Sequence, residues 1–111
     1  MELLLKKTFK DLIDMVEVVA DRFFLAKRAF EINNKDYFAE LDMPSQEYYE
    51  EYLNKVSQAF ASLSARERNL INNEFFYQGY NNWWESIYSK ATFYRYKRKA
   101  MMKFLEAFYH D

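Results

Sequence analysis

The sequence contains no cysteine, one glycine (Gly79) and one proline (Pro44) among its 111 residues. Without cysteine, the chain can form no disulfide, no thiolate nucleophile and no zinc-thiolate site. A single glycine argues against a glycine-rich phosphate-binding loop, and the scarcity of turn-forming residues favours helices over strands. The length fits one domain, or one domain with a helical extension.

Histidine is almost absent as well, since His110 is the only one and lies next to the end of the chain. Ser64 and Ser89 are better explained as helix caps than as nucleophiles, because no histidine can be placed beside them. The acidic residues between 47 and 51 are typical of a solvated helix face rather than of a metal site. We therefore expect no catalytic residue, no metal site and no cofactor, and hence a protein that is not an enzyme.

Long apolar runs are also missing, and none approaches the roughly 20 residues of a membrane-spanning helix. The three leucines at 3–5 are flanked by Glu2, Lys6 and Lys7. That segment is too short and too charged to be the core of a signal peptide. We therefore expect a cytoplasmic protein with no membrane partner.

Charge is distributed unevenly, although the net charge is only −1. Residues 1–63 carry eight Lys or Arg against twelve Asp or Glu, whereas residues 64–111 carry eight against five. Residues 36–51 contain six acids and no base, and residues 89–103 contain no acid. The basic residues of that second segment are Lys90, Arg95, Lys97, Arg98, Lys99 and Lys103. Such runs are typical of solvated faces, but a basic run also suits an anionic partner.

An apolar stripe runs along the first third of the chain, with alternating steps of four and three residues. Its members are Leu5, Phe9, Leu12, Val16, Val19, Phe23, Ala26 and Phe30. This heptad spacing predicts one amphipathic helix of about 30 residues within 1–35, ending near Asn33 and Asn34. Two interpretations stay open: the stripe packs on the chain's own domain, or it binds a partner such as a second copy in a homodimer.

Residues 36–44 read as an acidic linker, because Pro44 disfavours helix in the residue before it and suits the start of the next helix. With Ser45 as its cap, a helix is predicted over residues 46–62. Its apolar residues recur at helical spacing. They are Tyr49, Leu53, Val56 and Phe60.

Two further helix starts follow. The segment 64–67 reads Ser-Ala-Arg-Glu, in which Ser64 and Glu67 predict a capping box. The helix that begins there should bury Leu70, Ile71 and Phe75 and should end before Gly79.

Asn81 and Asn82 can cap a short helix containing Trp83, Trp84 and Ile87. The two tryptophans are expected to anchor this short helix to the core. Ser89 can then cap a final helix.

The final helix is predicted to have an apolar back and a basic front, at about 100° per residue. Its back consists of Phe93, Tyr96, Ala100, Phe104 and Ala107. Its front consists of Ala91, Arg95, Arg98 and Met102, flanked by Tyr94 and Lys99. A basic helix that follows a short helix fits a helix-turn-helix, whose second helix enters the DNA major groove. Arginine can donate two hydrogen bonds to a guanine edge, and lysine can neutralise phosphates.

Two segments add a family resemblance. Residues 60–71, Phe-Ala-Ser-Leu-Ser-Ala-Arg-Glu-Arg-Asn-Leu-Ile, resemble the opening of region 4 of sigma-70-type transcription factors. Residues 89–100, Ser-Lys-Ala-Thr-Phe-Tyr-Arg-Tyr-Lys-Arg-Lys-Ala, are similar to the recognition helix of that region and to the C-terminal motif of ArpU-type phage regulators. The resemblance covers about residues 60–108, and the first 60 residues show no counterpart of the promoter-melting region of sigma factors.

The resemblance implies promoter-type DNA recognition, with Lys90, Ala91, Tyr94 and Arg95 facing bases. Together with the front of the final helix, it gives a predicted DNA-binding set. The set is Lys90, Ala91, Thr92, Tyr94, Arg95, Arg98 and Lys99.

The sequence thus predicts an all-α fold of four to five helices, with a long amphipathic helix (1–35), an acidic linker (36–44) and a helix-turn-helix domain (45–111). The predicted function is a DNA-binding transcriptional regulator, with duplex DNA as its partner and RNA polymerase as a second candidate. The alternative is a helical adaptor that binds protein through the N-terminal stripe and does not bind DNA.

Overall fold

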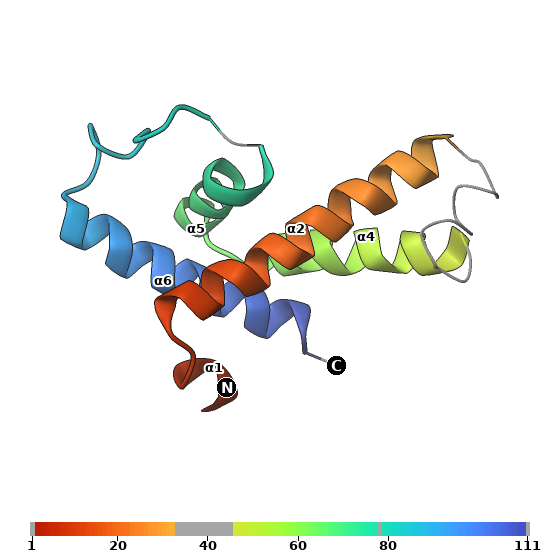
Figure 1. Cartoon of the computed structure of the whole chain (residues 1–111), viewed down its shortest axis with the longest axis horizontal. Helices are drawn as coiled ribbons and strands as arrows, with labels where there is room; N and C mark the ends of the chain where they lie inside the picture. The colour runs from red at the N-terminus through yellow and green to blue at the C-terminus, as the bar shows by residue number, and fades with distance from the viewer. Residues whose placement is uncertain (1, 33–45, 78, 111) are drawn as a thin grey trace.

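The computed structural model describes residues 2–32, 46–77 and 79–110, and their regular structure is helical (Figure 1). The elements are α1 (Glu2–Leu5), α2 (Phe9–Ile32), α4 (Gln46–Ala61), α5 (Ala65–Ile71), the π-helical segment η1 (Asn72–Phe76) and α6 (Lys90–Phe108). The described residues contain no strand, which confirms the all-α prediction. None of the described helices is long and apolar enough to cross a membrane.

One apolar core joins the N-terminal helices to the C-terminal ones. It extends from Leu4 in α1 to Phe108 at the end of α6. The helix α2 lies across α6 and alongside α4 (Figure 1), and a smaller cluster of Ala26, Ala29 and Tyr49 joins α2 to α4 beyond the main core. The predicted linker at 36–44 lies outside the described residues, but α2 and the helices after it share one core.

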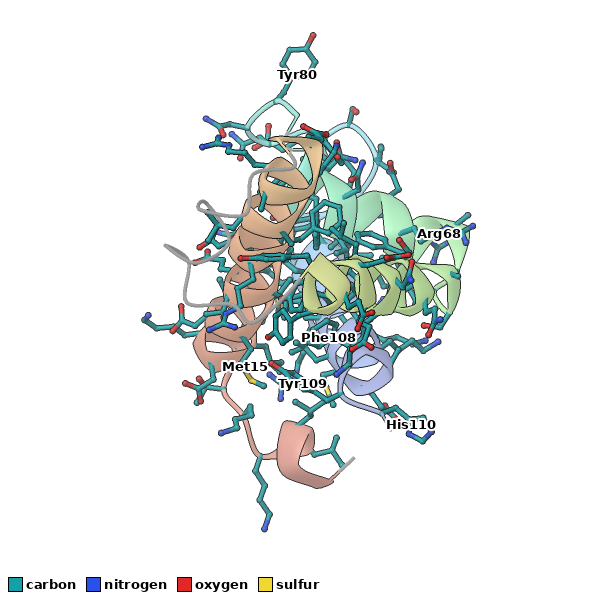
Figure 2. All side chains as sticks on the ribbon, turned by 90° about the vertical axis from the view of Figure 1, so that its right-hand side faces the viewer. Met15, Arg68, Tyr80, Phe108, Tyr109 and His110 are labelled. Carbon is teal, nitrogen blue, oxygen red and sulfur yellow. The ribbon has the colours of Figure 1, made fainter. Side chains whose placement is uncertain are left out.

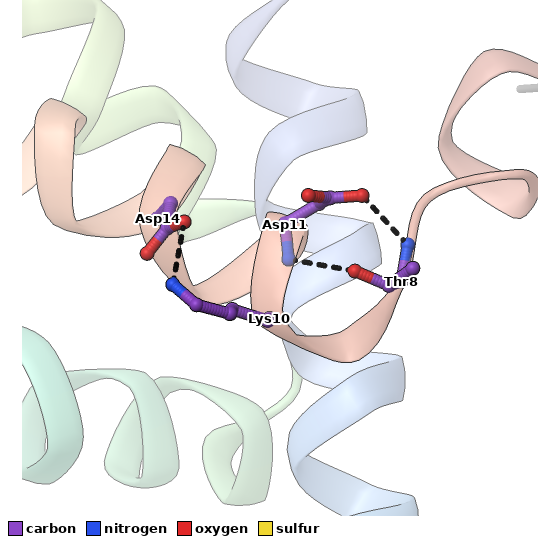
Figure 3. Close-up of polar contacts among 4 residues, drawn as sticks. All are labelled: Thr8, Lys10, Asp11 and Asp14. Atoms are coloured by element: carbon purple, nitrogen blue, oxygen red, sulfur yellow. Dashed lines mark hydrogen bonds and ion pairs between the residues drawn. The ribbon is translucent and has the colours of Figure 1, made fainter.

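The N-terminal segment differs from the prediction, because the helix is interrupted after Leu5 instead of running on without a break. The Thr8 hydroxyl accepts a hydrogen bond from the Asp11 backbone N–H, and the Asp11 carboxylate accepts one from the Thr8 N–H, both at 3.1 Å (Figure 3). This reciprocal cap begins a new helix at Phe9. The break also rotates α1, so that Leu4 is buried while Leu5 is 64% exposed.

The apolar stripe of α2 packs on the chain's own domain. Leu12, Val16, Val19 and Ala26 are buried, and Phe9 and Phe23 are half-buried. The side chain of Phe30 lies outside the described residues. Packing against α4 and α6 therefore accounts for the buried members of the stripe, and binding of a homodimer or another protein partner through this stripe stays a prediction from the sequence.

The middle helices agree with the prediction. The helix α4 buries Tyr49 and Val56 fully and half-buries Leu53 and Phe60. Its predicted cap, Ser45, lies outside the described residues.

The capping box of α5 is present, and Leu70, Ile71 and Phe75 are buried as expected. The hydrogen-bonding pattern changes after Ile71, where η1 continues the helix with wider turns.

The predicted short helix with Trp83, Trp84 and Ile87 does not form. Residues 81–87 form consecutive turns, and Asn82 has a φ of 61°, which breaks a right-handed helix. A segment of under two turns gains few hydrogen bonds for the cost of nucleating a helix. The tryptophans nevertheless pack against the core as expected, whereas Ile87 is exposed.

Candidate nucleic-acid interface

The helix α6 has the two faces that the sequence predicts. Ser89 is its N-cap, with the Ser89 hydroxyl accepting a hydrogen bond from the Thr92 N–H at 3.2 Å. Phe93, Ala100 and Phe104 are buried, and Tyr96 and Ala107 are half-buried. Five of the predicted DNA-binding residues of α6 are exposed. They are Lys90, Ala91, Tyr94, Arg95 and Lys99.

Three of the predicted DNA-binding residues, Thr92, Tyr94 and Arg98, have partners elsewhere in the protein. The Thr92 hydroxyl accepts a hydrogen bond from the Ser89 hydroxyl at 2.9 Å, so Thr92 belongs to the helix cap. The Tyr94 ring contacts the Phe9 ring edge-on at 5.6 Å and is still partly exposed. One guanidinium nitrogen of Arg98 donates to the Lys7 carbonyl oxygen at 3.0 Å, which leaves the other N–H groups of that guanidinium for further contacts.

Lys97 does not belong to the exposed front, although it lies within the basic run. Its ammonium lies 2.7 Å from a carboxylate oxygen of Glu74 in η1, and the two side chains are only 13% and 18% exposed. The other carboxylate oxygen of Glu74 accepts a hydrogen bond from the Trp83 indole at 2.8 Å. Through these two contacts, Glu74 holds the segment that connects η1 to α6 against the α6 helix.

A ring contact of Trp84 also holds this connecting segment in place. Trp84 stacks face to face on Phe93, with the ring centroids 4.3 Å apart and the planes within 9°. The two rings thus hold residues 81–87 close to the start of α6. Tyr80, at the tip of this connection, is almost fully exposed and points away from the body of the protein (Figure 2).

Lys103 is the second cation that the fold neutralises. It pairs with Glu67 at 3.4 Å, while the other carboxylate oxygen of Glu67 accepts a hydrogen bond from the Ser64 N–H at 2.9 Å. Burial alone would raise the pKa of the Glu67 carboxyl. The hydrogen bonds with Ser64 and the charge of Lys103 outweigh burial and lower that pKa.

This lowered pKa predicts an acid dependence of stability. As the pH falls below about 4.5, the ordinary value for this carboxyl, the unfolded chain binds a proton at Glu67 while the folded chain does not. The stabilisation by ionised Glu67 is therefore complete above that pH and is lost as the pH falls through the folded pKa. We expect Glu67→Gln to flatten this acid-side decline in urea unfolding measured between pH 3 and 7. An unchanged decline would contradict the role of Glu67.

Arg66 is a neighbour of the basic front that sequence reasoning missed. Its guanidinium lies 4.8 Å from the centroid of the Tyr96 ring, and the Arg95 guanidinium lies 5.5 Å from the same centroid. Tyr96 thus brings an arginine of α5 close to an arginine of α6. The capping box could have indicated an exposed Arg66, but only the packing of α5 on α6 shows that it borders this face.

We call the exposed side of α6 with its arginine neighbour the basic face. It consists of Arg66, Lys90, Arg95, Arg98 and Lys99. A shallow hollow of about 280 Å³ lies on it, lined by Arg95, Arg98, Lys99, Met102, Lys103 and Glu106. Glu106 is the first acid that α6 carries, in its last turn. The charged residues in the first four turns of α6 are therefore all cations.

Comparisons of the chain with protein-family models, curated proteins and solved structures find no match. The resemblance of residues 60–108 to region 4 of sigma-70-type factors therefore stays a prediction from the sequence.

Proposed function

We propose that this protein binds duplex DNA by placing the basic face of α6 in the major groove, as a transcriptional regulator would. The observation that carries the proposal is the division of the cations of α6. Lys97 and Lys103 are paired with Glu74 and Glu67. Lys90, Arg95 and Lys99 are exposed and have no ion pair among the described residues.

The shape of the molecule supports this assignment. An α-helix with its side chains is about 10–12 Å across, which matches a major groove about 12 Å wide. The start of α6 lies at one end of the long axis of the protein (Figure 1). The outer side of its first turns can therefore approach a duplex without a clash with α4.

The proposal relies on α6 and its neighbours rather than on a two-helix motif. The expected first helix of the motif is replaced by the turns at 81–87, which Glu74 and Phe93 hold in place. It does not extend to a homodimer, since the stripe expected to bind a second copy is largely buried, and RNA polymerase stays a candidate partner from the sequence alone. DNA binding agrees with the cytoplasmic location that the sequence predicts.

Arg95 and Lys99 are expected to play separable roles. Arg95 lies near the start of α6, where a helix in the groove contacts base edges, and Lys99 lies one turn further along. We expect Arg95→Ala to weaken binding to the preferred site by about 1–3 kcal/mol and to reduce its preference over random DNA. Lys99→Ala should weaken binding to all sequences alike and lower the salt slope by about one.

Fluorescence anisotropy on a duplex selected from random sequences, repeated at several salt concentrations, measures both effects. Arg68→Ala is the matched control, because Arg68 lies on α5 beside Arg66 but lines a groove with Phe23 and Phe60 instead. Figure 2 shows its side chain pointing away from the body of the protein. If a folded Arg95→Ala/Lys99→Ala variant binds as tightly as Arg68→Ala, the basic face does not bind DNA and the adaptor hypothesis is favoured.

A further inference from the structure

The junction between α1 and α2 lies directly beside the basic face, although it is about 90 residues away along the chain. The guanidinium of Arg98 donates to the carbonyl oxygen of Lys7 at 3.0 Å. Leu4 anchors α1 in the core, and Phe9 contacts Tyr94 of α6. The junction is thus held against α6 by a hydrogen bond between two apolar contacts.

Asp11 and Asp14, at the start of α2, are occupied by local partners (Figure 3). Asp14 pairs with Lys10 at 3.3 Å. The Asp11 carboxylate bonds back to Thr8, and its hydrogen bonds with Thr8 lower the pKa of that carboxyl. Lys6 and Lys7 are exposed and form no ion pair among the described side chains.

We propose that Lys6 and Lys7 form a second DNA-contacting surface, which binds the phosphate backbone beside the groove that α6 enters. This inference rests on the proposed function and extends it to a part of the chain outside the predicted DNA-binding set. Phosphates are the partner that this chemistry favours, because exposed lysines act as point charges and carry no base preference.

The position of the junction agrees with such a role. Arg98 lies three residues after Arg95, about 4.5 Å further along α6 and on a neighbouring side of the helix. When Arg95 faces a base edge, the junction between α1 and α2, which Arg98 holds through Lys7, therefore lies beside α6. The flank of a helix in the major groove faces the wall of the groove, where the phosphates run.

The test compares two double variants of the full chain that remove the same charge. Lys6→Ala/Lys7→Ala should lower the salt slope of duplex binding by about 1.8, at about 0.9 for each phosphate that is no longer neutralised. It should leave the affinity ratio between selected and random duplexes unchanged. Lys27→Ala/Arg28→Ala removes two cations near the other end of α2 and should leave the slope as in the wild type.

Leu4→Asn adds a test of position without a change of charge. It loosens the apolar anchor of α1, so it should also lower the slope while circular dichroism stays helical. Equal slopes for the two double variants, or a change in the selected-to-random ratio for Lys6→Ala/Lys7→Ala, would overturn the inference and leave the proposed function standing. Absence of any duplex binding by the wild type at low salt would overturn both.

Discussion

Val19→Asp is expected to unfold the protein, whereas Val18→Asp should leave it folded. The two residues are neighbours on α2, but Val19 is 1% exposed and Val18 is 54% exposed. Val19→Asp loses about 2 kcal/mol of apolar burial and also places a carboxylate among apolar side chains, at a further cost of several kcal/mol. The combined loss is comparable to the roughly 5–15 kcal/mol that stabilises a domain.

Far-UV circular dichroism and urea unfolding measure this contrast, with Val18→Asp as the matched control. Comparing these two variants also tests whether the apolar stripe packs in the core or binds a partner. If Val19→Asp stays helical and only changes the sedimentation coefficient, the stripe is an interface and Val19 does not belong to the core.

The ion pair between Lys97 and Glu74 should give the second-largest effect. Lys97→Met leaves the Glu74 carboxylate nearly buried without its cation, and removing one partner of such a pair costs about 3 kcal/mol. Lys10→Met is the matched control, because Lys10 and Asp14 form an ion pair in which both side chains are exposed, at 83% and 57%. An exposed pair contributes less than about 1 kcal/mol, so the control should change urea unfolding little.

A double variant, Lys97→Met/Glu74→Leu, shows whether the loss comes from the Glu74 charge that Lys97 no longer neutralises. It should recover much of the stability lost in Lys97→Met, because two apolar side chains can fill the same space. Tryptophan fluorescence should still change in the double variant, since the Trp83 indole then has no carboxylate to bond. A double variant that is as unstable as the sum of both single variants would contradict the proposed coupling.

Local sequence patterns were enough to predict most of the helices and the two faces of α6. The capping box at Ser64 and Glu67, the Ser89 cap and the apolar spacing of α4 and α6 all depend on residues three or four positions apart. Such residues meet on one helix whatever the rest of the chain does. The cap at Thr8 and Asp11 belongs to the same local class, but the unbroken heptad spacing around it favoured one continuous helix instead.

The packing of the helices on one another determines which cations are available and where the chain leaves helical geometry. Lys97 and Arg98 are adjacent in the basic run, yet one is paired with Glu74 and the other holds Lys7. The turns at 81–87 allow the Trp83 indole to donate to Glu74 while the Trp84 ring stacks on Phe93, and these two contacts stabilise the turns. These contacts join residues between 9 and 91 positions apart, so local spacing carries no information about them. They arise when α2, η1 and α6 bury their apolar faces in one core.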